Sequence, residues 1–219
     1  MKNLLIIASL IGILFSSNGP YVVVLGIAQD GGLPHAGCDK TCCKGLWETN
    51  EGEKVSCIGV VDPRTKQSWL IDATPDLPEQ LRTLTLDHKT ELAGIFLTHA
   101  HMGHYVGLLQ LGREVMGAKD IPIYAMPRMR SFLENNGPWN QLVELENIKI
   151  QSLKEGKELK IGEQLFIEPF LVPHRDEYSE TVGFRIMGPE QSLIYIPDID
   201  KWEKWEQNIY KLVMNIDFA

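Results

Sequence analysis

The sequence predicts an α/β fold, built either as one α/β domain or as a layered sandwich. Its 219 residues are enough for one substantial hydrophobic core, whereas two large domains would not fit easily. The apolar run Leu92–Leu97, followed by a predicted helix at Tyr105–Met116, is typical of a buried parallel strand and the helix after it. Between Ile148 and Ile196, short strands alternate with tight turns, which predicts a second, mainly antiparallel sheet.

The first 19 residues differ in composition from the rest of the chain. Lys2 precedes an apolar stretch from Leu4 to Phe15, and the small polar run Ser16–Gly19 ends the segment. This pattern is typical of a secretory signal peptide, because the apolar part is shorter than the ~20 residues of a membrane-spanning helix. An uncleaved anchor, or an N-terminal strand and helix, is the alternative. We expect residues 1–19 to be a signal peptide and the protein to be exported, periplasmic or secreted, without stable membrane insertion after processing.

The first predicted strand is the apolar, β-branched run Tyr21–Ile27. The loop Gln29–His35 follows and contains two consecutive glycines, which permit the tight backbone that a loop across a site requires. Asp30 and His35 are candidates to face a metal or substrate from this loop, with Asp30 as a residue that supports the site. A turn aspartate and a surface histidine are the plainer interpretation.

Three cysteines, Cys38, Cys42 and Cys43, lie close together after this loop. Their spacing, C-x3-C-C, is not that of a regular zinc knuckle. A structural metal site and a disulfide are equally good interpretations, with free thiols as the third. The fourth cysteine, Cys57, lies in the predicted strand Val55–Val61 and is expected to be a small core residue.

A turn at Asp62–Lys66 joins that strand to the next one, Ser68–Asp72, so the two form a predicted hairpin. Asp72 ends the second strand and would lie beside the strand Leu92–Leu97 if the two are neighbours. From there its carboxylate would orient a histidine by accepting a hydrogen bond from the ring. A capping or loop aspartate is the alternative. The helix that follows is predicted to run from Thr74 to Asp87.

Half of the six histidines lie within six residues, directly after the buried strand, at His99, His101 and His104. His99 and His101 are two residues apart, so both rings can point the same way where the strand ends. His104 would return from the start of the next helix. Neutral imidazoles that converge in this way form a transition-metal site, with zinc as the default metal. A chance cluster in a polar loop is the alternative.

Two further residues, His174 and Asp198, each follow a proline at the end of an apolar strand. Either one alone is ordinary, since a single histidine at a strand end is more often structural than a ligand. Together with His99 and His101, they would supply three imidazoles and a carboxylate from strand ends. We therefore take these four residues as candidate metal ligands.

The last part of the sequence predicts a helix at Asp200–Tyr210 and one more buried strand at Lys211–Phe218. The sequence ends at Ala219, inside this apolar strand. We therefore expect the folded domain, residues 20–219, to lack its C-terminal part, which could carry a further site residue.

The charge distribution restricts the class of partner. The formal net charge is −8 at pH 7, and acidic residues are spread along the chain. Binding to a nucleic acid backbone needs a basic surface, so we expect no nucleic acid partner. A small-molecule substrate fits better, and the oligomeric state is left open.

The histidine motif, together with the later Pro-His and Pro-Asp pairs, resembles the metallo-β-lactamase superfamily over residues 21–218. The glycine-rich loop and the cysteines after it are most similar to the branch that holds pyrroloquinoline quinone biosynthesis protein B and the phosphodiesterases of phosphonate metabolism. This resemblance implies an αββα sandwich with a metal site at one edge, between the sheets. It also implies that the three clustered cysteines hold a structural zinc, although their spacing differs from the branch.

The resemblance also assigns roles to the candidate ligands. His99, His101 and His174 match the histidines of the first metal site, Asp198 matches the carboxylate that bridges two metals, and His104 matches a ligand of the second metal. These roles remain expectations until the positions of the side chains are known.

Two departures from the superfamily pattern affect the second metal. The pattern is H-x-H-x-D-H, and Gly103 stands where the aspartate is expected. The last histidine of the family would lie beyond Ala219. The second metal would then keep His104 and Asp198, too few for tight binding unless water, Asp30 or another group substitutes. We expect one catalytic zinc, or two metals bound unequally, with iron as the other candidate metal.

Three functions are compatible with these residues. The first is a metal-dependent hydrolase of a small ester or phosphodiester, in which a metal activates water, Asp198 holds it or accepts its proton, and Tyr105 or His104 stabilises the oxyanion. The second is an iron- and oxygen-dependent oxidation, as the resemblance to the quinone-biosynthesis branch admits. The third is metal binding without catalysis, after erosion of the second site at Gly103.

Overall fold

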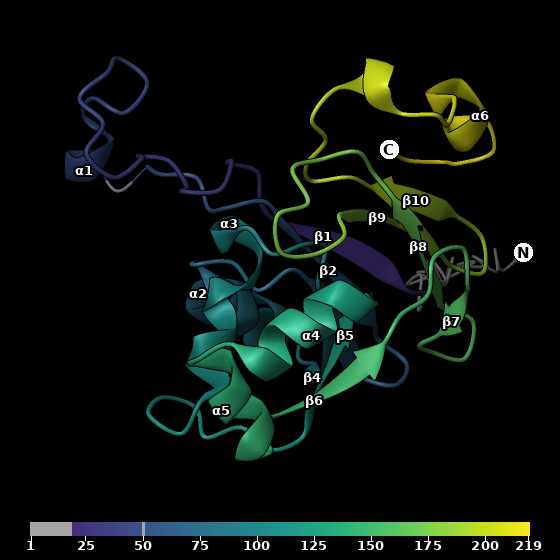
Figure 1. The fold of residues 1–219 in the computed structure, drawn as a ribbon, viewed down its shortest axis with the longest axis horizontal. Helices are drawn as coiled ribbons and strands as arrows, with labels where there is room; N and C mark the ends of the chain where they lie inside the picture. The colour runs from purple at the N-terminus through teal and green to yellow at the C-terminus, as the bar shows by residue number, and fades with distance from the viewer. Residues whose placement is uncertain (1–18, 50) are drawn as a thin grey trace, which may run out of the picture.

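Two β-sheets pack face to face, with helices outside them (Figure 1). The computed structural model of the protein describes residues 19–49 and 51–219, so the predicted signal peptide lies outside the described residues except for Gly19. The arrangement confirms the expected α/β class and the αββα sandwich. Within the described ranges, no helix is long and apolar enough to cross a membrane.

The first sheet is mixed and has six strands in the order β1-β2-β3-β4-β5-β6. The pairs β1/β2 and β2/β3 are antiparallel, and the pairs from β3 to β6 are parallel. The carboxyl ends of β3 and β4 therefore meet at one edge of the sheet. The strands are β1 (Tyr21–Gly26), β2 (Cys57–Asp62), β3 (Gln67–Ile71), β4 (Glu91–Phe96), β5 (Ile121–Ala125) and β6 (Ile148–Ser152).

The second sheet is antiparallel, as predicted, with the order β10-β9-β8-β7. Its strands are β7 (Leu159–Lys160), β8 (Phe166–Leu171), β9 (Val182–Met187) and β10 (Ser192–Tyr195). Its inner face packs on β2, β3 and β4 through a fully apolar layer. In this layer the rings of Phe96 and Phe184 meet edge to face, with 5.7 Å between their centroids. Burial of such large side chains from both sheets holds the sandwich together.

Most helices cover the outer face of the first sheet, where a second apolar layer includes Leu77, Leu108 and Leu133. Figure 1 shows α2, α4 and α5 grouped on this side, whereas α1 projects away and α6 lies beyond β10. The helices are α1 (Leu46–Thr49), α2 (Leu77–Arg82), α3 (Met102–Tyr105), α4 (Pro127–Asn135), α5 (Trp139–Glu144) and α6 (Ile209–Val213). Three other helical segments are a π-helix, η1 (Thr83–Asp87), and two 3-10 helices, η2 (Val106–Leu111) and η3 (Trp202–Lys204).

The strand before the histidines is confirmed as β4, which is parallel to both of its neighbours. The helix after it is shorter than predicted. It consists of α3 and η2 and ends at Leu111 instead of Met116, because Gly112 adopts an extended backbone with φ −65° and ψ 168°. His104 accordingly lies in the first turn of helical structure after the strand.

The C-terminal prediction was wrong. A helix does not run over 200–210; instead η3 is followed by α6, whose start is capped by the Asn208 side chain accepting a hydrogen bond from the Tyr210 N–H at 2.9 Å. The predicted strand Lys211–Phe218 is mostly helix and turn, because the apolar residues Leu212, Val213 and Ile216 pack on the second sheet at helical spacing. Phe218 forms an isolated bridge with Leu193.

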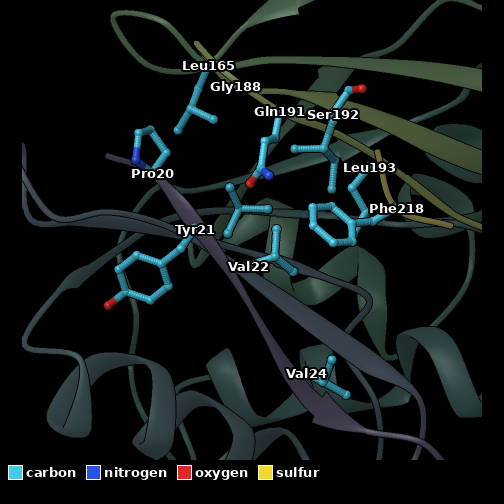
Figure 2. A pocket seen from close by; sticks show the side chains of 12 residues that line it. Pro20, Tyr21, Val22, Val24, Leu165, Gly188, Gln191, Ser192, Leu193 and Phe218 are labelled. Carbon is cyan, nitrogen blue, oxygen red and sulfur yellow. The ribbon is translucent and has the colours of Figure 1, made fainter. Parts of the chain in front are cut away.

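An apolar cavity of about 380 Å³ lies between β1 and the neighbouring edge of the second sheet. Figure 2 shows Val22 and Val24 from β1 on one side of it and Leu193 and Phe218 on another. No histidine, cysteine or acidic side chain lines this cavity. The chemically reactive groups of the described chain therefore gather elsewhere.

Candidate metal centre

The ends of two adjacent parallel strands make the frame of the site. Asp72 directly follows β3, and Thr98 lies just beyond the end of β4. The buried Asp72 carboxylate accepts hydrogen bonds from the Thr98 backbone N–H at 2.8 Å and from its hydroxyl at 2.9 Å. Asp72 has a φ of 75°, a left-handed conformation that aspartate adopts more readily than most residues. These bonds tie the strand ends together and fix the point from which the histidines leave the sheet.

Four side chains, His99, His101, His174 and Asp198, converge next to this frame. His101 Nδ1 lies 3.0 Å from His99 Nε2 and 3.0 Å from His174 Nε2. Asp198 Oδ2 lies 3.5 Å from His99 Nε2 and 3.9 Å from His174 Nε2. The four donor atoms all lie within 4.8 Å of one another. We call this set the histidine group.

The spacing in the histidine group fits a metal ion. At Zn–N distances of about 2.0–2.1 Å, the ligand atoms of a tetrahedral site stand about 3.3–3.4 Å apart. The separations in the histidine group run from 3.0 to 3.9 Å and bracket that value. Three imidazole nitrogens and one carboxylate oxygen are donors that zinc and iron both accept. The residues present can therefore hold either metal.

Hydrogen bonds on the far side of the rings select which nitrogen faces the group. The Thr98 hydroxyl donates to Asp72, so its oxygen is left to accept the Nδ1–H of His99 at 3.0 Å. The Glu177 carboxylate accepts the Nε2–H of His101 at 2.9 Å. His99 Nε2 and His101 Nδ1 are thus the unprotonated ring nitrogens and face the group, which is the tautomeric state that a metal requires. In the metal-free structure, the Arg175 guanidinium donates to His101 Nδ1 at 3.3 Å, a bond that a metal would replace.

His104 belongs to a second, adjacent set of donors. Its Nδ1–H donates to Asp72 at 2.7 Å, and its Nε2 lies 3.2 Å from Asp198 Oδ2 and 3.2 Å from Asp30 Oδ1. The ring is 2% exposed. Asp198 is therefore shared between the histidine group and this set of Asp30, His104 and Asp198, which we call the Asp30 group.

The electrostatics of the metal-free site separate the histidines into two kinds. Burial lowers the pKa of His99 and of His174, although Asp198 acts in the opposite direction. Burial alone would also lower the pKa of His104, but Asp72, Asp198 and Asp30 outweigh it and raise that pKa to about 11. His99 and His174 are therefore neutral near pH 7, as ligands must be, whereas His104 exchanges a proton for any metal that binds it.

The carboxylates respond to the same rings. Burial would raise the pKa of Asp198, but the neighbouring His104 and His99 rings more than offset it and hold the pKa far below its ordinary value. A hydrogen bond from His104 lowers the pKa of Asp30. Both groups are therefore anionic over the physiological range and supply negative charge for a cation.

The cysteines form a separate set in the segment before α1, which projects from the two sheets in Figure 1. The sulfur atoms of Cys38, Cys42 and Cys43 lie within 4.8 Å of one another, and the His35 backbone N–H donates to Cys43 Sγ at 3.3 Å. All four cysteines are free thiols, and Cys57 is buried in the core as expected. The three sulfur atoms are thus close enough to bind one metal ion, and the choice between a metal site and a disulfide stays a prediction. The His35 ring packs against Gly31 and is not among the donors.

Tyr105, like His35, is a predicted site residue that the structure does not bring to a metal group. Its ring packs in the apolar layer, with centroids 5.3 Å from Phe132 and 4.9 Å from Trp139. Burial raises the pKa of the Tyr105 hydroxyl, and the nearby Tyr178 raises it further. This position gives no support to the expected role of Tyr105 at an oxyanion.

Three supporting residues escaped the sequence reasoning. Thr98 and Glu177 orient histidines, and the buried Ser179 hydroxyl accepts the Ala100 N–H at 2.8 Å, which holds the loop between two ligands. Thr98 could have been suspected from its place next to His99. Neither Glu177 nor Ser179 belongs to a motif that sequence alone would single out.

Comparison with known proteins gives one family. Residues 68–219 match the model of the beta-lactamase superfamily domain. Coenzyme PQQ synthesis protein B of Methylorubrum extorquens (strain PA1) is 25% identical over 198 residues, which cover 81% of this chain and 64% of that protein. The corresponding protein of Rhodopseudomonas palustris (strain BisB5) is 30% identical over 130 residues, or 56% of this chain and 41% of that protein. The chain therefore spans less than two thirds of the length of these relatives.

Two solved structures share the fold. The Zn(2+)-bound PqqB from Methylobacterium extorquens superposes with a TM-score of 0.69 at 22% identity, covering 83% of this chain and 67% of that one. A diphosphatase from the PhnP family superposes with a TM-score of 0.60 at 21% identity, covering 81% and 64%. At these identities the likeness establishes the architecture alone.

Proposed function

Since this chain belongs to the metallo-β-lactamase superfamily and is similar to its PqqB members, we propose that it is a metal-dependent hydrolase with zinc in the histidine group. One observation carries the proposal: three imidazole nitrogens and a carboxylate oxygen converge with separations of 3.0–3.9 Å, and two of the rings are held in the tautomer that binds metal. A zinc-bound relative of the same fold supports zinc as the first metal to test.

Each group in the site has its own role in the proposed reaction. Zinc, when bound, supplies Lewis acidity that brings the pKa of water from ~16 towards ~7 and makes hydroxide available at neutral pH. Asp198, which is anionic and lies next to three histidines, holds the attacking water by a hydrogen bond and is the nearest acceptor for its proton. When no second metal is bound, His104, fixed by Asp72, directs a protonated Nε2 to the same place and is positioned to stabilise a developing negative charge.

A cavity of about 400 Å³ adjoins Glu177 and is a place for the substrate. Arg128, Phe132 and Tyr178 line it. Arg175 does not line this cavity but lies beside the histidine group, with its guanidinium 3.9 Å from the Glu177 carboxylate and 3.3 Å from His101 Nδ1. Two arginines and two aromatic rings near the ligands favour a small anionic ester, such as a phosphodiester, as the substrate class.

The same ligands support a second candidate, an iron- and oxygen-dependent oxidation, since three histidines and a carboxylate also suit iron. A protein that binds metal without turnover is the third. Metal content and the type of reaction separate the three: zinc with ester or phosphodiester cleavage supports the hydrolase, iron with oxygen consumption supports the oxidation, and neither activity supports the binding protein.

The test is metal analysis of the purified protein and of the variants His99→Ala and His101→Ala, combined with turnover of phosphodiester and carboxylic ester substrates. Each variant should lose one equivalent of metal and all turnover. His88→Ala is the matched control, because His88 contacts Tyr21 on the far side of the fold from the ligands and should leave both unchanged. Unchanged metal content in both ligand variants would refute the proposed site.

A further inference from the structure

We propose that Asp30 is a direct ligand of a second metal position, with His104 and Asp198, and that Gly103 exists to admit it. This inference rests on the proposed function, because Asp198 joins the Asp30 group to the histidine group. In this inference Asp30, a loop residue far from the histidines in sequence, takes the ligand role that the aspartate of the H-x-H-x-D-H motif would have at the second metal.

The three donor atoms are already gathered. Asp30 Oδ1 and Asp198 Oδ2 each lie 3.2 Å from His104 Nε2, and all three atoms lie within 4.8 Å of one another. Two carboxylates and one imidazole are suitable donors for zinc, and an open position would be left for water. Because Asp198 also borders the histidine group, the two metal positions would be neighbours that share a carboxylate.

His104 is prepared for this role by a buried partner. Its Nδ1 is bound to Asp72 at 2.7 Å, and Asp72 is fully buried and held in turn by Thr98. The ring cannot turn without breaking this bond, so its Nε2 stays directed at Asp30 and Asp198. An aspartate–histidine pair of this kind is the usual support behind a metal-bound imidazole.

Asp30 reaches the site because position 103 has no side chain. A Cβ atom at Gly103 would lie 2.6 Å from Asp30 Cα, 2.9 Å from its backbone oxygen and 3.0 Å from its Oδ1. Two of these atoms are backbone, so the contact could be relieved only by moving the whole loop. The loop around Asp30 and the start of α3 therefore fit together only with glycine at 103. Asp30 and Gly103 act as one arrangement, in which the carboxylate comes from the loop instead of from the helix.

This arrangement changes the interpretation of Gly103 as a sign of a lost metal site. Gly103 in place of aspartate would indicate an eroded second site if the space beside it were empty. The space is filled by another aspartate that contacts the same histidine. Restoring an aspartate by Gly103→Asp should therefore displace Asp30 and fail to add a metal.

The test counts zinc ions by native mass spectrometry during titration of the metal-free protein with zinc. Asp30→Asn keeps the shape of the side chain but removes its charge, and should weaken one zinc equivalent at least about tenfold while the others bind as in the wild type. Gly103→Ala should weaken the same equivalent although every ligand is intact. Asp87→Asn, at an exposed carboxylate in η1, is the control and should bind as the wild type does.

The outcomes separate this inference from the proposed function. If Asp30→Asn binds the same number of ions with the same affinity as the wild type, Asp30 is only an ion-pair partner of His104 and the inference is overturned. If His99→Ala retains every equivalent, the histidine group itself is refuted. Loss of metal in His99→Ala with no change in Asp30→Asn upholds the first metal site and rejects Asp30 as a ligand of a second one. Should Gly103→Ala be poorly folded, Asp30→Asn alone decides the question.

Discussion

The histidine group and the cysteine group offer similar numbers of donor atoms but are built in opposite ways. Donors of the histidine group leave the ends of buried strands, and Asp72, Thr98 and Glu177 hold the rings from behind. The cysteines lie in a short segment that projects from the sandwich, where Cys42 is exposed and the hydrogen bonds are local turn bonds such as that from the Cys43 N–H to the Lys40 carbonyl at 2.9 Å. The first group is therefore oriented by the protein itself, and we expect the second to gain its order from a bound metal.

Asp72 holds both Thr98 and His104 in place, so substitution of Asp72 has the largest expected effect on stability. Asp72→Ala would leave His104 and the Thr98 N–H without their buried partner, and we expect the free energy of unfolding to fall by about 3–5 kcal/mol. Urea denaturation, with Asp87→Ala as the control, measures this. A loss of less than 1 kcal/mol would mean that the strand ends do not need this carboxylate.

The metal-free protein should also show a pH dependence that comes from His104. The pKa of His104 is raised to about 11, so its contribution to stability is complete below its unfolded pKa of ~6.5 and declines as pH rises toward 11. Stability should therefore fall between pH 6.5 and 9, by at most about 1.4 kcal/mol per pH unit. The depressed pKa values of Asp198 and Asp30 contribute above ~3.8 and are lost only in acid.

Urea denaturation of the chelated protein at several pH values tests this dependence. His104→Gln provides the comparison, because it lacks the titrating ring and should show a much flatter profile over the same range. Equal slopes in the two proteins would contradict a raised pKa at His104.

Metal removal should affect the cysteine segment more than the histidine group. Trypsin has two exposed sites there, Lys40 and Lys44. If the three sulfur atoms bind a metal, a chelator should speed cleavage at both sites at least about tenfold, because the segment would lose the cation that orders it. Cys43→Ser should be cleaved rapidly with or without chelator, and His99→Ala should behave like the wild type. Cleavage that does not respond to the chelator would indicate that the thiols are free in solution.

The smallest effect on stability is expected at Glu177. Its carboxylate is half exposed, so Glu177→Ala should change the free energy of unfolding by no more than about 0.5 kcal/mol. Zinc affinity of the histidine group should nevertheless fall roughly tenfold, because His101 loses the acceptor that fixes its tautomer. Zinc titration measures the affinity, with Glu163→Ala, at an exposed glutamate, as the control. Unchanged affinity would show that the bond to Glu177 does not orient the ring.

The ligands of the histidine group were predictable because each follows an apolar strand. Parallel strands deliver their carboxyl ends to one edge of a sheet, so the placement of His99 and Asp72 at adjacent strand ends could be expected from the sequence pattern. The antiparallel second sheet was equally clear from its short strands and tight turns. These features depend on local hydrophobic patterns, which sequence reasoning reads directly.

The features that escaped prediction depend on contacts between distant segments. Nothing near Asp30 indicates that its loop crosses the start of α3 at Gly103, and nothing near Glu177 indicates that it meets His101. The apolar residues near the C-terminus are compatible with either a strand or a helix. The Asn208 cap and the packing of these residues on the second sheet favour the helix. Tertiary packing determines the positions of Asp30 and Glu177 and the helix near the C-terminus, and local sequence patterns carry no information about such packing.

The central claim is that the histidine group holds a catalytic metal. Anomalous diffraction at the zinc edge, from crystals of the zinc-loaded protein, tests it most directly because it locates each ion. The account predicts a strong peak in contact with the ring nitrogens of His99, His101 and His174 and with the Asp198 carboxylate. A fully zinc-loaded crystal with peaks at the cysteines but none at the histidine group would contradict it.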